Sequence, residues 1–147
     1  MANNRNKNVE SIEKHLRKVD YIIRKNGRMI LSDFGITVPQ FTALQALINN
    51  GDMTIGELSQ QMDLACSTIT DLIDRMEKND LVKREKDQKD KRVVRVIVLA
   101  RGHDILQKVL ERRIIFLESK LEGLSLDEVA GLKSALEKLY FEMNEDK

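Results

Sequence analysis

From residue 9 to residue 30, apolar side chains recur at steps of three, four, three, four and seven positions, and this spacing predicts one long amphipathic helix. The stripe consists of Val9, Ile12, Leu16, Val19, Ile23 and Ile30. Its heptad-like period is typical of a helix that packs against another helix. We expect Asn26 and Gly27 to be its weak points, and the segment DFGIT (33–37) to end it.

A second, shorter helix is predicted after this break. Thr37 can cap it, and Pro39 lies in its first turn, where a missing N–H costs little. Gly51 is expected to end it after two asparagines. Its buried face is predicted to consist of Phe41, Leu44, Leu47 and Ile48.

Two further short helices follow, joined by a turn over residues 63–65. Thr54 and Glu57 predict a capping box at the start of the first, which runs to about Met62. The apolar residues of the second fall at i, i+3, i+4 and i+7, namely Ile69, Leu72, Ile73 and Met76. Two short helices with so tight a connection predict a helix-turn-helix.

Residues 81–85 and 92–99 predict two antiparallel strands. The second is rich in β-branched residues, and the loop between the two, KDQKDK (86–91), is polar and cationic. A hairpin that directly follows a helix-turn-helix is a wing.

The remaining chain predicts two more helices. The apolar period is helical again from His103 to Leu121, and Ser125 with Glu128 predicts a capping box for the last helix. That helix is expected to bury Val129, Leu132, Leu136, Leu139 and Met143. The middle of the chain can close its own core, so the terminal stripes need another partner, and a second copy of the chain is the economical candidate.

Together these elements predict a mainly α protein with a small β-hairpin wing. We assign residues 1–36 to an N-terminal dimerisation helix and residues 37–100 to a winged helix-turn-helix DNA-binding domain. Residues 101–147 are assigned to C-terminal dimerisation helices.

Charge is distributed unevenly along this chain of 147 residues, whose formal net charge is only +1. Residues 29–62 contain no Lys or Arg, whereas residues 83–95 hold seven cations and three carboxylates, a local balance of 7 − 3 = +4. The seven are Lys83, Arg84, Lys86, Lys89, Lys91, Arg92 and Arg95. A cationic wing beside a helix-turn-helix favours contact with DNA phosphates.

Other functional classes have little support. A lone Cys66 and the absence of an apolar membrane or signal segment favour a cytoplasmic protein. His15 and His103 are far apart and lack a dense ligand cluster, so we expect no metal. Neither a Gly-rich phosphate loop nor a nucleophile–base arrangement is evident, so we expect no cofactor and no enzymatic activity.

The segment LSQQMDLACSTITDLIDRMEKNDLVKREKDQKDKRVVRVIVL (58–99) resembles the multiple antibiotic resistance regulator (MarR) family of bacterial transcription factors. The resemblance rests on STIT (67–70), DRMEK (74–78), LVKR (81–84) and DKR (90–92). It implies that the protein forms a homodimer and binds a roughly palindromic operator. Members of the family usually repress transcription. A ligand or an oxidant would lower the DNA affinity by changing the separation of the two recognition helices.

The sequence departs from the family pattern at several positions. Asp71 stands on the outer face of the recognition helix, where the family often has Arg or Lys, and Asp80 replaces the usual Gly at its end. Leu99 and Ala100 replace the usual Thr-Glu after the wing. The N-terminal cysteine of the hydroperoxide-sensing branch is absent, which argues against that redox mechanism.

The candidate DNA-binding residues lie on the recognition helix and the wing. They are Cys66, Ser67, Thr68, Thr70, Asp71, Arg75, Lys86, Lys89, Lys91 and Arg92. Thr68 is expected to serve mainly as a helix cap, and Asp71 can accept from a cytosine amino group. Arg75 either contacts the DNA backbone or pairs with an acidic neighbour. By resemblance, Arg92 enters the minor groove, and Asp90 orients a neighbouring cation.

By analogy with the family, an effector cleft would lie between the dimerisation helices and the winged domain, suited to a small phenolic-type molecule. Its candidate lining is His15, Tyr21, Met29, Phe34 and Phe41, which are alternatively core residues. If a ligand binds there, it must prefer the DNA-incompetent spacing.

Two alternative functions remain open at this point. Cys66, at a helix N-terminus, could act as an oxidation switch on the DNA face, or it could be a partly buried structural thiol. The acidic recognition helix would also suit a winged-helix module that binds protein and not DNA.

Overall fold

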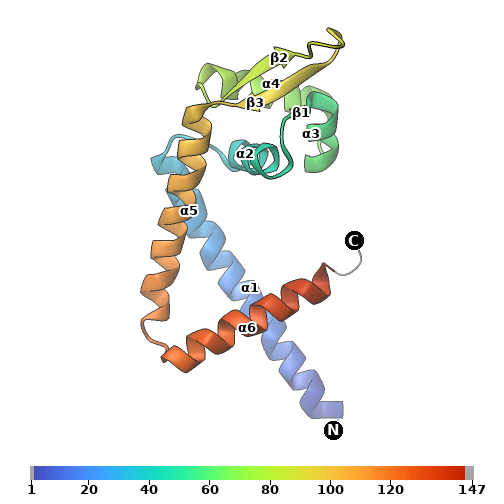
Figure 1. Cartoon of the computed structure of the whole chain (residues 1–147). Coiled ribbons are helices and arrows are strands. Elements are labelled where there is room, and N and C mark those ends of the chain that lie inside the picture. The colour runs from blue at the N-terminus through green and yellow to red at the C-terminus, as the bar shows by residue number, and fades with distance from the viewer. Residues whose placement is uncertain (1, 145–147) are drawn as a thin grey trace. The chain divides into compact units, whose positions relative to one another are not determined.

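The computed structural model describes residues 2–144, with side chains placed for residues 7–144. The chain divides into two compact units, residues 1–111 and 112–147, and helix α5 (Ala100–Leu121) runs from the first into the second. Figure 1 shows the order of elements, which is six helices and three short strands over the described residues. Among these helices, none combines the length and apolar character that crossing a bilayer requires.

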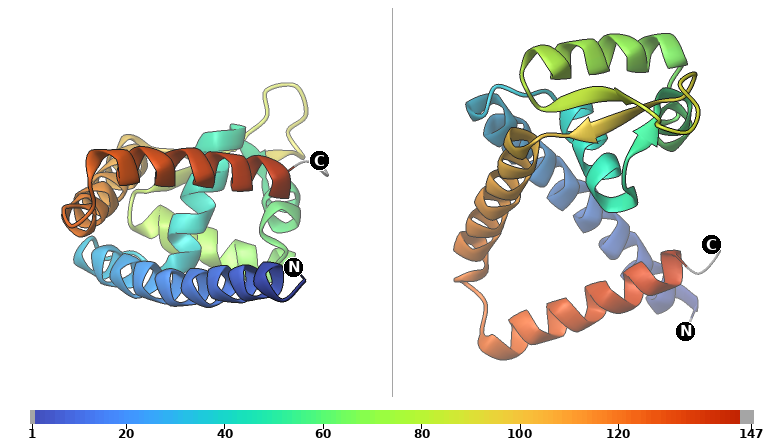
Figure 2. Two further views of the ribbon diagram at one scale, coloured as in Figure 1. Left: turned by 90° about the horizontal axis from the view of Figure 1, so that it is seen from below. Right: turned by 45° about the horizontal axis from the view of Figure 1, so that its top comes forward.

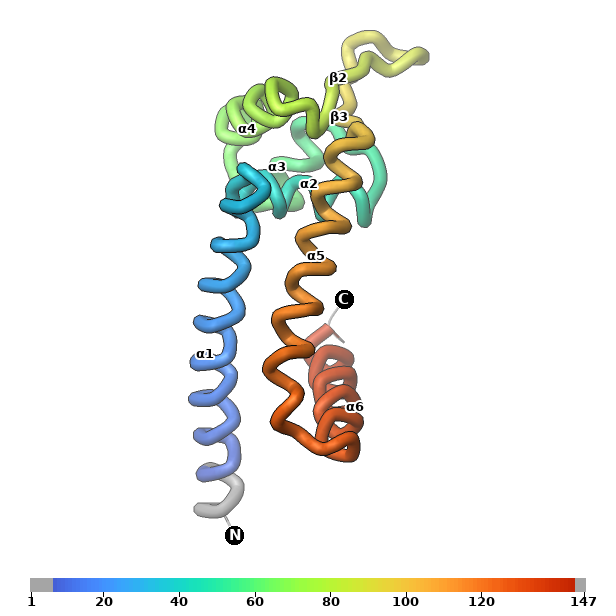
Figure 3. The backbone as a smooth tube through the Cα atoms, turned by 90° about the vertical axis from the view of Figure 1, so that its left-hand side faces the viewer, coloured from blue at the N-terminus to red at the C-terminus, as the bar shows by residue number. Residues whose placement is uncertain are grey.

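The first helix, α1, spans Ala2–Asp33 without interruption. It therefore continues through Asn26 and Gly27, which were expected to be weak points. Most of its apolar stripe is exposed: Val9, Ile12, Leu16 and Val19 are between 41% and 60% accessible. In Figure 3, α1 extends away from the winged domain on the side opposite α4 and the wing tip. The helix reaches the core only at its end, where Ile30 and Leu31 are buried.

Helix α2 (Val38–Asn50) begins at Thr37, as predicted. The Thr37 hydroxyl accepts from the Gln40 amide at 3.3 Å, and the Gln40 carbonyl oxygen accepts from the Thr37 amide at 3.0 Å. Gln40 is 5% exposed, and this reciprocal pair satisfies its side-chain Oε1 atom and its backbone amide. The helix ends at Gly51, whose φ of 85° is favourable only for glycine.

The helix-turn-helix consists of α3 (Ile55–Met62) and α4 (Cys66–Lys78). The Thr54 hydroxyl accepts from the Glu57 amide at 3.1 Å, but the predicted reciprocal bond from Glu57 is not formed, so the capping box is incomplete. The backbone of Thr54 is instead part of a short strand, β1 (Met53–Thr54). In the turn, the Ser59 hydroxyl donates to the Leu64 carbonyl at 2.8 Å, which ties the end of α3 to the turn before α4.

The sheet has three strands in the order β1-β3-β2, one more than predicted. Strand β2 (Val82–Lys86) pairs antiparallel with β3 (Val94–Val98), and Thr54 of β1 lies opposite Arg95. β2 begins one residue later than predicted because the Leu81 amide still donates to α4, at Met76. Figure 2 shows α4 beside the β2–β3 hairpin in its right-hand view.

The core of the winged domain is formed by α2, α3, α4, the hairpin and the start of α5. The four residues predicted to face inward from α4, Ile69, Leu72, Ile73 and Met76, are 0–9% exposed. α5 approaches this core closely at Gly102, where an added Cβ would lie 2.5 Å from the Leu81 carbonyl oxygen. The packing therefore requires a residue without a side chain at this position.

The second unit contains the end of α5 and helix α6 (Leu126–Met143). α5 begins at Ala100, three residues before the predicted start. The predicted capping box is confirmed: the Ser125 hydroxyl accepts from the Glu128 amide at 3.1 Å, and the Glu128 carboxylate accepts from the Ser125 amide at 3.0 Å. No residue of α6 is buried within the chain, although this helix was predicted to have an apolar face.

Candidate nucleic-acid interface

The first turn of α4 presents polar groups to solvent. Cys66, Ser67 and Thr68 are all exposed, and Ala65, the N-cap residue, has no side-chain oxygen. The helix therefore starts without a side-chain cap, and the capping role expected for Thr68 is not fulfilled. The backbone amides of a first turn have no partner within the helix, so they can donate to an external acceptor such as a phosphate oxygen.

The exposed face of α4 continues with Thr70, Asp71 and Arg75. The Thr70 hydroxyl donates to the Cys66 carbonyl at 2.9 Å. The Thr70 side chain can therefore contact a ligand through its methyl group, or its hydroxyl oxygen can accept a hydrogen bond. Over residues 7–144, neither Asp71 nor Arg75 takes part in an ion pair. Pairing with an acidic neighbour was one of two expected roles for Arg75. Contact with the DNA backbone stays a prediction.

Arg84, on β2, connects the wing to the exposed side of α4. Its guanidinium Nη2 donates to Asp74 Oδ1 at 2.6 Å, and its Nη1 donates to Glu77. The Arg84 backbone amide also donates to Glu77 Oε2 at 3.0 Å, and Nη2 lies 3.4 Å from the Thr70 carbonyl oxygen. We call the ion pairs of Arg84 with Asp74 and Glu77 the Arg84 clamp.

The Arg84 clamp changes the charge that α4 presents. Burial disfavours the charged guanidinium, but hydrogen bonds to Asp74 and Glu77 outweigh this effect and raise the pKa of Arg84 above its ordinary value. Arg84 remains a cation, and its single positive charge offsets one of the two negative charges that it pairs with on α4. Asp71 is then the one carboxylate of α4 without an ion pair among the described residues, so the helix is less acidic than its sequence indicates.

Both aspartates of the wing loop shape the backbone. Asp87 Oδ1 accepts from the Lys89 amide at 3.3 Å, and Asp90 Oδ1 accepts from the Arg92 amide at 3.1 Å. Each bond spans two residues, which is the geometry of an Asx turn. The loop closes through the Asp87 amide and the Val93 carbonyl at 2.9 Å. The acidic residues therefore fold the loop on which the cations are displayed.

Arg92 is held in place by Asp90. The Arg92 Nε donates to Asp90 Oδ1 at 3.1 Å, and the Arg92 side chain is 91% exposed. The hydrogen bond from the Arg92 side chain, with a second from its backbone, lowers the pKa of Asp90. The carboxylate is thus ionised in neutral solution and restricts an arginine that otherwise faces solvent. Whether this orients Arg92 on DNA stays a prediction.

Three lysines of the wing have no carboxylate partner among the described side chains: Lys86, Lys89 and Lys91. Lys83 differs, because its Nζ lies 3.3 Å from Glu85. Of the seven cations counted in the sequence, two are thus engaged with acids of α4 or β2, and Arg92 with Asp90 in the loop. That Lys86, Lys89 and Lys91 contact DNA phosphates stays a prediction.

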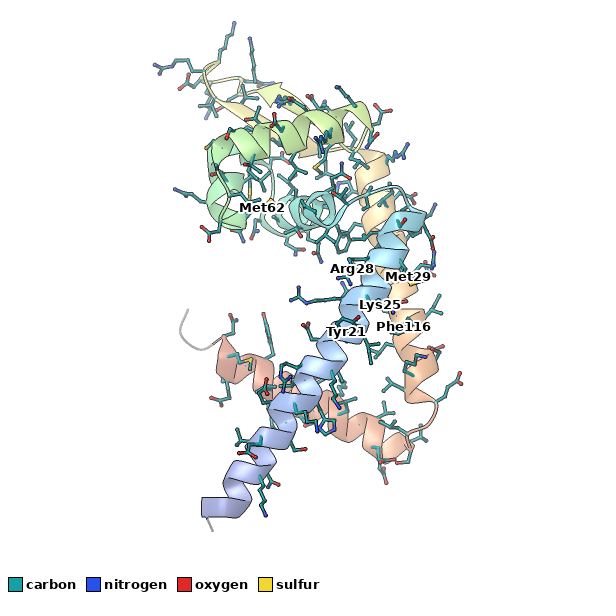
Figure 4. All side chains as sticks on the ribbon, turned by 180° about the vertical axis from the view of Figure 1, so that it is seen from behind. Tyr21, Lys25, Arg28, Met29, Met62 and Phe116 are labelled. Atoms are coloured by element: carbon teal, nitrogen blue, oxygen red, sulfur yellow. The ribbon has the colours of Figure 1, made fainter. Side chains whose placement is uncertain are left out.

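The candidate effector residues lie in different surroundings. Phe41 is buried in the core, and Phe34 packs against it. Tyr21 and Met29, labelled in Figure 4, are 63% and 62% exposed on α1. His15 is also exposed, with its Nδ1 atom 2.7 Å from the Ser11 carbonyl oxygen. Among the five, only the two phenylalanines take part in the core or pack against it, and a cleft that includes all five stays a prediction.

A shallow cavity of about 350 Å³ lies where α1 meets α2. Its lining is Arg28, Leu31, Ser32, Gly35, Ile36, Thr37 and Val38, none of which belongs to the candidate effector set.

The helix-turn-helix, with an exposed second helix and a lysine-bearing wing, defines a winged-helix DNA-binding protein. The sequence model of the MarR family matches residues 36–94. Over 135 residues, the chain is 51% identical to the uncharacterized HTH-type transcriptional regulator YsmB of Bacillus subtilis (strain 168), and the match covers 92% of each protein. The chain belongs to the MarR family and is a DNA-binding transcriptional regulator.

Solved structures agree with this assignment. A MarR family protein from Bacillus stearothermophilus superposes with a TM-score of 0.83 at 45% identity, over 93% of this chain and 96% of that one. A mutant of S. aureus MepR bound to an oligodeoxyribonucleotide superposes with a TM-score of 0.73 at 17% identity, over 90% of this chain and 98% of that one. At that identity, the second likeness concerns the fold alone.

Sequence reasoning missed the role of Arg84, which it counted among the wing cations. A signal was present, because alternation along a strand turns Arg84 to the opposite face from Lys83 and Glu85. Asp74 and Glu77 are three residues apart and so share one side of α4. An arginine facing two such acids would have indicated an ion pair.

Proposed function

We propose that the chain acts as a homodimer that binds a two-fold symmetric operator sequence and represses transcription. The observation that carries the proposal is the arrangement of the wing. Its acids fold the loop or pair with cations, while Lys86, Lys89 and Lys91 have no ion pair among the described residues and belong to the hairpin whose strand β2 packs against α4. Repression is the direction that the family resemblance implies, and the work of such a regulator on chromosomal DNA would take place in the cytoplasm.

In this proposal α4 enters the major groove and the wing reaches the neighbouring minor groove. The uncapped first turn, with Ser67 and Thr68, would bind phosphate oxygens. Asp71 would read a cytosine amino group. Arg92 would enter the minor groove, where A·T-rich sequences have a strongly negative potential that suits a guanidinium.

The homodimer is supported by the apolar surface of the terminal helices. On α1, Val9, Ile12 and Val19 are at least half exposed in the single chain. In the second unit, Ile114, Leu136 and Phe141 are 50–67% exposed. Exposed stripes of this length are unusual on a monomeric protein and mark an interaction surface. The proposed roles of residues 1–36 and 101–147 in dimerisation follow from this.

We propose further that a small phenolic-type effector releases the DNA, as the family resemblance implies. Such a ligand lowers the DNA affinity only if it binds more tightly to a dimer whose recognition helices are wrongly spaced for DNA than to the DNA-binding dimer. A redox switch at Cys66 is the alternative, since this thiol is exposed at the start of α4. The Cys66→Ser variant should bind DNA normally. If peroxide releases wild type and variant equally, the thiol is not the sensor.

Selection of duplexes from random-sequence DNA with the purified protein tests the proposal. We expect a two-fold symmetric site whose half-sites are about one helical turn apart. Affinity for that site should fall steeply with salt, because bound lysines and arginines displace counterions. A protein-interaction module would instead enrich no sequence and would show no steep salt dependence.

A further inference from the structure

Strand β2 separates its cations onto two faces. Lys83 lies on the exposed face and pairs with Glu85 of the same strand, and its side chain is 52% exposed. Arg84 points the other way, toward α4, and its side chain is 27% exposed. The two neighbours carry the same charge, but of their two side chains only that of Arg84 forms ion pairs with another element of the fold.

The contacts of Arg84 span about two turns of α4. Thr70, Asp74 and Glu77 follow each other at spacings of four and three residues, so their acceptors line one side of the helix. The guanidinium donates to Asp74 through Nη2 and to Glu77 through Nη1. The Arg84 backbone amide forms a second hydrogen bond to Glu77. This arrangement limits both sliding and rotation of β2 relative to α4.

We propose that Arg84 is a positioning residue for DNA binding, which holds the wing at a fixed spacing from the recognition helix and does not itself contact DNA. The inference rests on the proposed use of α4 and the wing on the same duplex. Two elements that enter adjacent grooves must keep the spacing of those grooves. A wing tied to α4 in the free protein loses little freedom when it binds.

The Arg84 clamp also removes charge, and the two effects must be separated. Asp74 and Glu77 would repel phosphates if they were unpaired, so the loss of Arg84 could weaken binding through charge alone. Removing the two acids has the opposite effect on charge, because it makes the DNA-binding surface more positive by two units. Spacing and charge therefore predict opposite signs for the same variant.

The decisive variant is Asp74→Ala/Glu77→Ala, measured by fluorescence anisotropy with a duplex selected by the wild-type protein. If charge dominated, its affinity would rise. We expect it to fall by roughly 10-fold or more, the scale of losing a pair of charged hydrogen bonds. Glu85→Ala is the matched control, because it removes a carboxylate of the wing without touching the Arg84 clamp. Its affinity should be unchanged or higher.

A second pair of variants tests the same point from the other side. Arg84→Gln and Lys83→Gln remove one positive charge each from adjacent residues. Neither residue is proposed to contact a phosphate, so both variants should leave the slope of log affinity against log salt close to that of wild type. At any one salt concentration, Arg84→Gln should bind about 10-fold more weakly than Lys83→Gln. Arg84→Lys should recover only part of this loss, because a lysine ammonium is a single nitrogen and cannot bond to Asp74 and Glu77 through two separate nitrogens.

Folding is checked separately. Amide hydrogen exchange should become faster in β2 and in the wing loop of the Asp74→Ala/Glu77→Ala variant, while the buried core of α4 stays protected. If this variant binds the duplex as well as wild type or better, the positioning role is wrong. Equal losses for Arg84→Gln and Lys83→Gln would also overturn it. Failure of the wild-type protein to bind any duplex would instead remove the proposed function, and this inference with it.

Discussion

The winged domain and helix α1 differ in where they place their apolar residues. Leu44, Ile73 and Val96 of the winged domain are fully buried, although each lies on a different element. On α1, Val9, Leu16 and Val19 leave between 41% and 60% of their surface exposed. The winged domain closes its core within one chain, whereas the regular stripe of α1 is left largely uncovered by the described residues of unit 1. Stability should thus respond differently to changes in the two regions.

The largest expected effect is at Gly102 in the winged domain. Replacing Gly102 by Ala places a Cβ atom 2.5 Å from the Leu81 carbonyl oxygen and 2.7 Å from Val98 Cγ1. The carbonyl cannot easily retreat, because it accepts from the Leu99 amide at 2.9 Å. We expect a loss of about 3–5 kcal/mol in the free energy of unfolding, measured by urea denaturation.

Gly27 provides the matched control for Gly102. It lies within α1, where an added Cβ meets nothing within 4 Å. Gly27→Ala should therefore stabilise the protein by about 0.5–1 kcal/mol, because alanine favours the helix. The same chemical change is expected to act with opposite sign in the two regions. A comparable loss at both positions would mean that Gly102 is not constrained by packing.

The next effect concerns the exposed stripe of α1. Replacing Leu16 by Asp puts a charge into the proposed dimer interface and forfeits the burial of a leucine, about 2–3 kcal/mol per copy. We expect the protein to dissociate at micromolar concentration, as measured by sedimentation equilibrium. Circular dichroism should show that the winged domain is still folded.

Lys14→Asp serves as the control, because residue 14 lies on the opposite side of α1 from residue 16. It introduces the same carboxylate but should leave the dimer intact. Dissociation of both variants, or of neither, would contradict the assignment of the apolar stripe to the interface.

The same contrast explains what the sequence could predict. The period of Ile69, Leu72, Ile73 and Met76 correctly indicated the inner face of α4, because a helix that packs on one core repeats its contacts regularly. Contacts between distant elements leave no such period. The two-residue strand β1 exists only through its pairing with β3, and Gly102 is required because α5 closely approaches Leu81, Val98 of β3 and Leu44 of α2.

The candidate DNA-binding residues show the same division. Alternation and cationic composition located the wing, but a count of charges along the sequence did not separate the engaged cations from the others. Arg84 was counted with the wing lysines, although alternation placed it on the opposite face from Lys83, and the fold shows that it faces two acids of α4. Charge counted along the sequence therefore overestimates the free cations of the wing and the acidity of the recognition helix.

The smallest expected effect distinguishes two neighbouring cations of the wing tip. Lys91 has no ion-pair partner among the described residues, whereas Arg92 is held by Asp90 through its backbone amide and its side chain. A side chain that is already restricted loses less freedom on binding DNA. We expect Arg92→Ala to reduce binding free energy by about 1–3 kcal/mol, as for a groove contact, and Lys91→Ala to cost less. Each should reduce the slope of log affinity against log salt by about one. Equal losses in affinity would show that Arg92 acts only as another charge at the wing tip and that the Asp90 pair does not orient it.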